Sequence, residues 1–299
     1  MAALPDGSAW AVGIYTQNSG HTGRALAEHW SDGRWTVVPA ADPGSREDML
    51  YSAAAAGDSD VWAVGTYSGA DGRFHPLVEH WDGHRWSVSR VRGLGAADGI
   101  LTSVSWAADG GAWATDQLTG GRAPDQEVVL SLVGGSWVIA RRGPVSTPQG
   151  AAASAYPQAV AASPAGPWLA GNDRTGHLGF STLVQAPGIG GRLIELAAPD
   201  PTPQDNYLGG ITPVNGGKDA WAVGESIPVA TTNGMSLIEY GSVSGGWTVV
   251  PSPDPGAANG NTFLDGVLAF SATNVWAVGT YDGTGGMRTL VMHYTGGTG

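Results

Sequence analysis

The chain has 299 residues, of which 48 are glycine and 19 are proline, and only 13% are Asp, Glu, Lys or Arg. Its formal net charge of −12 opposes binding to nucleic acid or acidic membranes, and the absence of cysteine excludes a disulfide framework, a thiolate zinc site and a thiol nucleophile. A hydrophobic fraction of 42% with 13 tryptophans argues against a disordered chain.

The first segment, Met1-Ala-Ala-Leu-Pro-Asp-Gly, lacks the basic region and the long apolar run of a signal peptide. No stretch of about 18 apolar residues occurs anywhere in the sequence, so we expect no membrane insertion. If the natural protein is secreted, its signal lies outside this chain.

Six similar phrases follow one another along the chain: SAWAVG (8–13), DVWAVG (60–65), GAWATD (111–116), GPWLAG (166–171), DAWAVG (219–224) and NVWAVG (274–279). Their tryptophans, Trp10, Trp62, Trp113, Trp168, Trp221 and Trp276, are spaced by 52, 51, 55, 53 and 55 residues. A fixed period near 50 residues is typical of propellers, solenoids and arrays.

Each period contains four strand-like runs, which in the second repeat are Leu50–Ala56, Val61–Tyr67, Pro76–Trp81 and Arg85–Ser89. The first–second and third–fourth junctions are short and carry the Asp and Gly that tight turns need. Six four-stranded repeats favour a propeller, because each repeat makes one small sheet. The sequence therefore predicts an all-β, six-bladed β-propeller of four-stranded antiparallel blades, forming a single domain over residues 1–299.

The second strand of each repeat predicts how neighbouring blades pack. Alternation places Trp62, Val64 and Thr66 on one face and Ala63 and Gly65 on the other. We expect the large face of one blade to pack on the small face of the next, which makes the six tryptophans core residues.

The motifs WAVG, LVEHWDG (77–83) and W-x-V resemble the repeats of bacterial WAVG-repeat propeller proteins, which are largely uncharacterised and often exported. They resemble kelch and galactose-oxidase-type propeller repeats more loosely. The resemblance covers the whole chain and implies the fold, but hardly any function. The turns SDGRW (31–35) and WDGHRW (81–86) are similar to the Asp-box hairpins of sialidase propellers, which are structural and do not imply sialidase chemistry.

The last repeat supplies only three runs, Phe263–Ala269, Val275–Tyr281 and Arg288–Tyr294, and its outer strand is missing. Either the sixth blade is three-stranded, or the chain is a piece of a longer protein whose flanks complete the ring. We favour the second interpretation, because an exposed edge strand promotes aggregation.

The longer connections, between the second and third strands and between successive repeats, are expected to share one face. Long loops on a rigid scaffold usually carry binding and catalytic groups. Aromatic, carboxylate and amide side chains where these loops enter the first strands suit sugars or small polar ligands. These predicted ligand-binding residues are Asp48, Tyr51, Asp98, Tyr156, Asn206, Tyr207, Asn261, Phe263 and Asp265. The alternative is that Asp and Asn cap turns while the aromatics plug the mouth.

Arginines occur in the second-to-third connections, and we add Arg24 and Arg288 to the predicted site. The others are Arg73, Arg122 and Arg174. A ring of arginines could bind carboxylate or phosphate. In an acidic protein, pairing with nearby Asp and Glu is the alternative that we favour.

The sequence contains no H-E-x-x-H, G-x-S-x-G, P-loop or dinucleotide motif, so we expect no metal site and no cofactor. We therefore favour a non-enzymatic binding module for a glycan, peptide or small polar ligand. The alternatives are an enzyme, either a glycan hydrolase or lyase or a small-molecule cyclase, and a structural or protein-interaction propeller. Carboxylates could still converge for catalysis from Asp48, Asp98, Asp205 and Asp265. We expect a monomer with a small polar ligand, glycan or protein as partner, extracellular or at the cell surface, with the cytoplasm as the alternative.

Overall fold

The computed structural model describes residues 1–17, 22–94, 98–107, 111–119, 126–143, 145–146, 152–174, 179–230, 233–256 and 260–296. The chain forms two compact units, Met1–Gly143 and Pro144–Gly299. In the described residues, no helix has the length and apolar character needed to cross a membrane.

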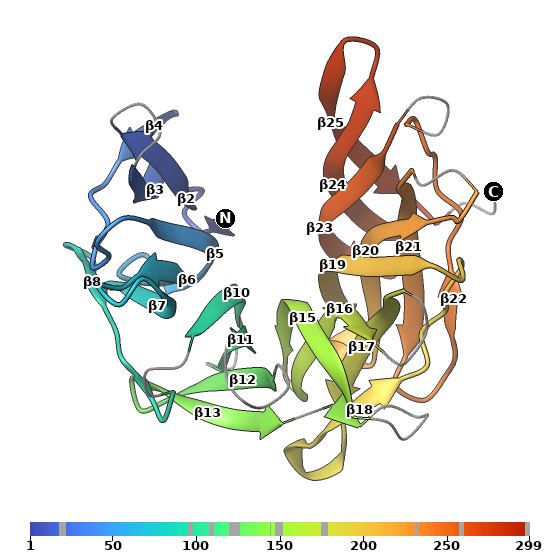
Figure 1. The fold of residues 1–299 in the computed structure, drawn as a ribbon, viewed down its shortest axis with the longest axis horizontal. Helices are drawn as coiled ribbons and strands as arrows, with labels where there is room; N and C mark the ends of the chain where they lie inside the picture. The colour runs from blue at the N-terminus through green and yellow to red at the C-terminus, as the bar shows by residue number, and fades with distance from the viewer. Residues whose placement is uncertain are drawn as a thin grey trace. The chain divides into compact units, whose positions relative to one another are not determined.

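The N-terminal unit contains three small sheets (Figure 1). Blade 1 consists of β1 (Ala2–Ala3), β2 (Ala9–Gln17), β3 (Thr22–Ser31) and β4 (Arg34–Val37). Blade 2 consists of β5 (Asp48–Gly57), β6 (Asp60–Ser68), β7 (Phe74–Trp81) and β8 (Trp86–Val88). Blade 3 consists of β10 (Asp98–Trp106), β11 (Ala112–Thr119), β12 (Gln126–Val133) and β13 (Ser136–Gly143), with β9 (Val91–Arg92) added parallel to β13.

The C-terminal unit contains three more sheets. Blade 4 consists of β14 (Val145–Ser146), β15 (Ala152–Ser163), β16 (Gly166–Arg174), β17 (Ser181–Pro187) and β18 (Leu193–Leu196). Blade 5 consists of β19 (Asp205–Val214), β20 (Asp219–Ile227), β21 (Met235–Ser242) and β22 (Trp247–Val249). Blade 6 consists of β23 (Thr262–Ser271), β24 (Asn274–Gly283) and β25 (Gly286–Tyr294). The 3-10 turns η2 (Ile189–Gly191) and η3 (Asn215–Gly217) complete the unit.

These sheets confirm the predicted six-bladed β-propeller, with three strands in the last blade. Blades 3 and 4 each carry one extra two-residue strand that the sequence did not predict. The connection between the second and third strands, which we expected to be a long loop, is partly strand in blades 1 and 6, because the hairpin arms run further than expected. In blade 6, Thr284 and Gly285 alone separate β24 from β25.

The predicted packing of a large face on a small face is confirmed inside each unit. Trp62 and Val64 of β6 pack against Ala112 and Ala114 of β11 in one buried cluster. Trp168 and Ala170 of β16 pack in the same way against Ala220 and Ala222 of β20. In these two interfaces, buried tryptophan and alanine side chains of neighbouring blades therefore pack together. The expectation that all six tryptophans are core residues is wrong for Trp276, which is 40% exposed.

A tryptophan in the fourth strand of one blade packs against the second-strand tryptophan of the preceding blade. The ring centroids of Trp10 and Trp86 are 5.1 Å apart, and those of Trp62 and Trp137 are 5.6 Å apart. Trp168 and Trp247 repeat the contact at 6.1 Å. The fourth strand therefore closes the outer part of the interface between blades.

A β-bulge recurs in the first strand of five blades. In each, one residue is skipped in the pairing with the second strand. The skipped residues are Tyr51, Thr102, Gln158, Gly209 and Asp265. A Cβ on Gly224, the glycine of the fifth WAVG phrase, would overlap the carbonyl oxygen of Tyr207 beside the bulge. The glycine is required here because the two backbones approach so closely.

Candidate functional site

In the N-terminal unit, Arg24 of β3 pairs with Asp48, the first residue of β5 in the next blade. Its Nη1 lies 3.6 Å from Oδ2 of Asp48, whose side chain is fully buried. The backbone N–H of Gly44 donates to Oδ1 of Asp48 over 2.7 Å. Burial raises the pKa of Asp48, and the Gly44 N–H and the Arg24 guanidinium partly offset that rise. This contact joins blade 1 to blade 2.

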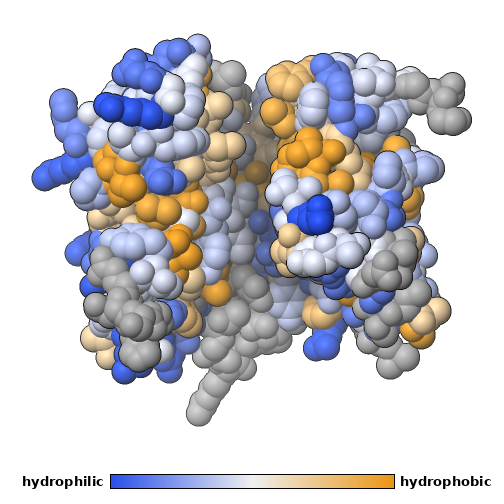
Figure 2. Space-filling model, turned by 90° about the horizontal axis from the view of Figure 1, so that it is seen from above, coloured by the Kyte–Doolittle hydropathy of each residue, from blue (hydrophilic) through white to orange (hydrophobic). Residues whose placement is uncertain are grey.

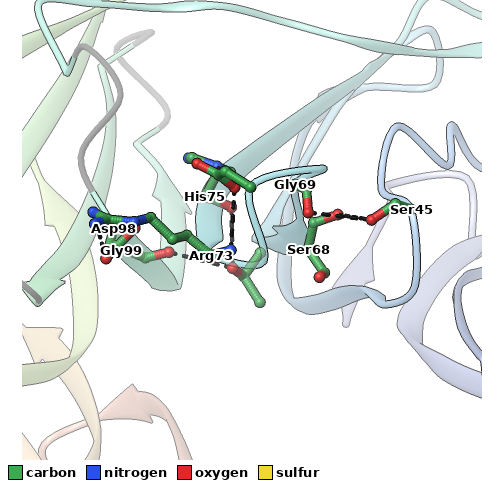
Figure 3. A network of polar contacts seen from close by, with 9 residues as sticks. Ser45, Ser68, Gly69, Arg73, His75, Asp98 and Gly99 are labelled. Carbon is green, nitrogen blue, oxygen red and sulfur yellow. Dashed lines mark hydrogen bonds and ion pairs between the residues drawn. The ribbon is translucent and has the colours of Figure 1, made fainter.

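The same contact recurs one blade later, and Figure 3 shows the network around it. Nη1 of Arg73 lies 3.3 Å from Oδ2 of Asp98, the first residue of β10. Nearby, Oγ1 of Thr66 donates to the carbonyl oxygen of Gly99 over 3.2 Å. Arg24 and Arg73 thus pair with local carboxylates, as in the alternative that we favoured from the sequence. Arg122 lies outside the described residues.

Tyr51, the bulge residue of β5, is 47% exposed. Its hydroxyl lies 3.6 Å from the sulfur of Met49. Burial of the hydroxyl end, with a smaller contribution from Glu47, raises the pKa of the phenol. Tyr51 therefore combines an exposed ring with a hydroxyl that is held locally.

Two predicted amides of the C-terminal unit hold loops. The side chain of Asn206 is buried, accepts hydrogen bonds from the backbone and hydroxyl of Thr202, and donates to its carbonyl. Asn261 accepts from the N–H of Gly234 and donates to Asp282, both over 2.9 Å. Both amides therefore shape the loop entries, and a direct role in ligand binding stays a prediction.

Three aromatic rings gather where blades 4 and 5 meet. Phe180, just before β17, has its ring centroid 5.9 Å from that of Tyr156 and 5.3 Å from that of Tyr207. The guanidinium of Arg174 lies 5.1 Å above the Phe180 ring. Asp205 anchors this arrangement, because its Oδ1 accepts the Phe180 N–H over 2.9 Å. Tyr156 and Tyr207 therefore both lie against the Phe180 ring.

Glu225 adds a carboxylate to these aromatics. It lies opposite Tyr207 in the pairing of β19 with β20. Burial, followed by the negative charges of Asp265 and Asp205, raises the pKa of Glu225 to about 7. Its Oε2 is buried and accepts no hydrogen bond from the described residues. We call Arg174, Phe180, Asp205, Tyr207, Glu225 and Asp265 the acidic–aromatic cluster.

Phe263 lies at the edge of this cluster. A Cβ placed on Gly234 would lie 3.6 Å from its Cε1 and would overlap Oε2 of Glu225. Because Gly234 has no side chain, it leaves room for the Glu225 carboxylate beside the Phe263 ring. Asp265, the bulge residue of β23, is exposed and adds its charge from the same blade.

Arg288 lies elsewhere in the C-terminal unit. It belongs to the β24–β25 hairpin, where its Nη2 donates to the carbonyl of Thr284 over 3.0 Å. No group of three or more His, Asp or Glu in the described part of the chain is arranged to hold a metal ion.

The sequence analysis missed Glu225 and Phe180. A signal for Glu225 was present, because it follows WAVG directly, where the other repeats carry Ile14, Thr66, Gln117, Asn172 and Thr280. A lone carboxylate at a position otherwise neutral departs from the repeat pattern. Phe180 had no such signal, because it lies in a connection that differs from blade to blade.

No family model and no curated protein matches this sequence. Among solved structures, the chain is similar to an ulvan lyase of the polysaccharide lyase family PL25, with a TM-score of 0.59, 10% identity, and coverage of 98% of this chain and 79% of that chain. It is also similar to Trypanosoma rangeli sialidase, with a TM-score of 0.56, 10% identity and coverage of 98% and 54%. YCF48 bound to a D1 peptide gives a TM-score of 0.50, 14% identity and coverage of 94% and 76%.

The chain spans about half the length of the sialidase that it matches. At these identities, the three similarities show a shared β-propeller fold alone. The WAVG-repeat and kelch resemblance is therefore supported at the level of the propeller.

Proposed function

We propose that the acidic–aromatic cluster binds a small ligand rich in hydroxyl groups, and that the protein works as a glycan-binding module. The observation that carries this proposal is the buried Oε2 of Glu225, which accepts no hydrogen bond from the described residues although it lies beside Phe263 and Tyr207. A buried acceptor without a donor costs free energy unless a ligand or water supplies one.

The chemistry of the cluster suits a sugar. The carboxylates of Asp205, Glu225 and Asp265 accept hydrogen bonds from hydroxyl groups, and aromatic faces such as Tyr207 pack on the C–H face of a pyranose ring. Ulvan lyase and sialidase, by their names, act on glycans, which supports this ligand class. An extracellular or cell-surface setting belongs to the same proposal.

An enzymatic function is the second candidate, and one observation favours it. Burial raises the pKa of Glu225 to about 7, and the negative charge of Asp265 adds to this rise. A carboxyl group that keeps its proton near neutral pH beside an ionised carboxylate is the arrangement of glycosidase acid/base pairs. In this candidate, Glu225 is the general acid and Asp265 or Asp205 supplies the second carboxyl group.

A calorimetric titration with a panel of neutral, uronic and amino monosaccharides and disaccharides tests both candidates. We expect saturable binding to one class, weakened at least tenfold in Glu225→Gln and in Tyr207→Ala. Asp58→Asn, in the exposed β5–β6 turn, is the matched control and should bind like wild type.

Equal affinity in wild type, Glu225→Gln and Tyr207→Ala would overturn the binding site. Incubating the protein with aryl glycosides of the same sugars distinguishes an enzyme from a binding module. Turnover that disappears in Glu225→Gln supports the enzyme, whereas binding without turnover supports the binding module.

A further inference from the structure

The acidic–aromatic cluster combines apolar surface with charge. Hydrophobic residues are exposed at several points on the surface of the protein (Figure 2), and in blade 6 Leu268 and Phe270 are more than half exposed. The cluster differs from such purely apolar surface, because its aromatic rings lie among the carboxylates of Asp205, Glu225 and Asp265. Its charge therefore bears on the kind of ligand that it can accept.

The carboxylates of the cluster form no ion pair in the part of the chain that the structure describes. None of the ion pairs there includes Asp205, Glu225 or Asp265. Arg174 is the arginine of the cluster, but its guanidinium lies 5.1 Å above the ring of Phe180. No described basic side chain therefore neutralises these carboxylates at contact distance.

Three strands from two blades supply the carboxylates. Asp205 is the first residue of β19, and Glu225 of β20 lies opposite Tyr207 in the pairing of these two strands. Asp265 comes from blade 6, where it lies at the bulge of β23 and is exposed. The charges of Asp265 and Asp205 both act on Glu225 and add to the effect of burial on its pKa. The three groups therefore share one negative environment, which favours a positive charge.

The cation that suits this environment is an organic one. Among the described residues, no group of three or more His, Asp or Glu has the arrangement that a metal ion needs. Aromatic rings flank Glu225, because Tyr207 is its cross-strand partner and its Oε2 and the Cε1 of Phe263 both lie within 4 Å of the Cβ position of Gly234. Ammonium groups bind aromatic faces as well as carboxylates. An ammonium on a larger molecule can therefore contact both.

We propose that the ligand of the acidic–aromatic cluster is an amino sugar, whose protonated amine donates to Oε2 of Glu225 and whose selection over neutral and uronic sugars depends on Asp265. This inference rests on the proposed glycan-binding function and names the class of sugar. An ammonium has three N–H donors and a positive charge, so it satisfies the buried oxygen with a charge-assisted hydrogen bond. A neutral hydroxyl supplies the donor without the charge, and the carboxylates repel a uronic acid.

Binding of the ammonium should release a proton from Glu225. Its raised pKa of about 7 means that this carboxyl is largely protonated in the free protein at pH 6.5. The charged and titratable groups around it are Asp205 and Tyr207 of β19 and Asp265 of β23, with Arg174 acting on Tyr207. An ammonium beside Oε2 favours the ionised carboxylate and lowers its pKa. The amine itself keeps its proton, because amino groups titrate at about pH 8 or above.

The experiment is a calorimetric titration of the full chain at pH 6.5 with glucosamine, N-acetylglucosamine and glucuronic acid. We expect glucosamine to bind about tenfold more tightly than N-acetylglucosamine, which has the same ring without the charge, and glucuronic acid to bind most weakly. Asp265→Asn should reduce the preference for glucosamine by about threefold, the effect of one exposed charge, while N-acetylglucosamine binds as before. Asp58→Asn, in the exposed β5–β6 turn, is the matched control and should keep the full preference.

Repeating the glucosamine titration in two buffers of different ionisation enthalpy gives the number of protons released. Release of about half a proton or more per bound sugar is expected in wild type, and no release in Glu225→Gln. If Glu225→Gln binds too weakly to titrate, N-acetylglucosamine provides the comparison, because it should release far fewer protons from wild type than glucosamine does.

Each outcome separates this inference from the proposed function. Equal affinity for glucosamine and N-acetylglucosamine, or glucosamine binding without proton release, overturns the amino sugar. Sugar binding that Tyr207→Ala still weakens then leaves the glycan-binding function standing. Absence of binding by any sugar overturns both. N-acetyl-lysine amide carries an amine without a sugar ring, and tighter binding of this probe than of glucosamine would assign the amine to a peptide and overturn the glycan.

Discussion

The backbone N–H of Ala41 donates a hydrogen bond to Oε2 of Glu79 over 2.9 Å. Glu239 occupies the same position in blade 5, but the residue corresponding to Ala41 is Pro199, which has no N–H to donate. The equivalence rests on the following aspartates, because Asp42 and Asp200 each accept a backbone N–H from the third strand of their own blade. Burial raises the pKa of Glu79 to about 8 and that of Glu239 to about 9.

Stability should therefore depend on pH through these two glutamates. Both pKa values in the folded chain lie above the ordinary value of 4.5, so the folded state holds protons that the unfolded state releases. Their contribution to the free energy of unfolding is complete below pH 4.5 and is lost as pH rises towards 8 and 9. Glu239→Gln should gain stability over wild type as pH rises across this range.

Denaturant titrations from pH 5 to pH 9 measure this difference between variant and wild type. Glu28→Gln, at the same strand position in blade 1 but only partly buried, is the control for the substitution itself. A Glu239→Gln variant whose profile runs parallel to wild type would show that the buried carboxyl does not titrate in this range.

The WAVG glycines provide a second test with an internal control. Gly224→Ala should destabilise the chain by about 1–3 kcal/mol, because the new methyl group would overlap the carbonyl of Tyr207 at the bulge. Gly13 occupies the same place in blade 1, where a Cβ would meet nothing within 4 Å. Gly13→Ala should change stability far less. Equal melting temperatures for both variants would mean that the bulge relaxes freely.

The packing of tryptophans between blades predicts a large loss of stability when one of these side chains is truncated. Trp62 is 4% exposed and meets the edge of Trp137 in blade 3. Trp62→Ala should lower the free energy of unfolding by about 3–5 kcal/mol, because it leaves a cavity that the flanking strands cannot fill. Trp62→Phe keeps a ring against Trp137 and should cost less. Calorimetric melting of both variants checks the order, and an undisturbed Trp62→Ala would place this side chain outside the core.

The two arginine–aspartate contacts should differ in strength. Arg73 is more than half exposed, so its removal should cost at most about 1 kcal/mol. Arg24→Ala leaves the fully buried Asp48 without its guanidinium and should cost clearly more. Urea unfolding of both alanine variants at one ionic strength measures the difference. The reverse order would mean that the Gly44 N–H alone satisfies Asp48.

The repeat in the sequence was sufficient to predict the fold, because Trp62 and Ala63 place alternate large and small side chains on opposite faces of one strand. It was insufficient for the site, because the bulge that displaces Asp265 depends on how two strands pair and not on composition. The pKa of Glu225 is raised by burial and then by the charges of Asp265 and Asp205, and the sequence pattern reveals neither the burial nor these neighbours. That residues 1–299 form a single domain stays a prediction.

The recurring bulge separates two kinds of structural constraint in one strand. Residues on either side of it pair in the ladder, and in blades 2, 4, 5 and 6 they face a glycine whose Cβ would overlap a backbone carbonyl, whereas blade 3 has Asp116 at that place. The skipped position falls at a shift in the pairing register, and five blades fill it with Tyr51, Thr102, Gln158, Gly209 and Asp265. Mutation can therefore alter recognition at these points while the blades keep their pairing, which makes them the natural positions for diversifying ligand choice in a designed library.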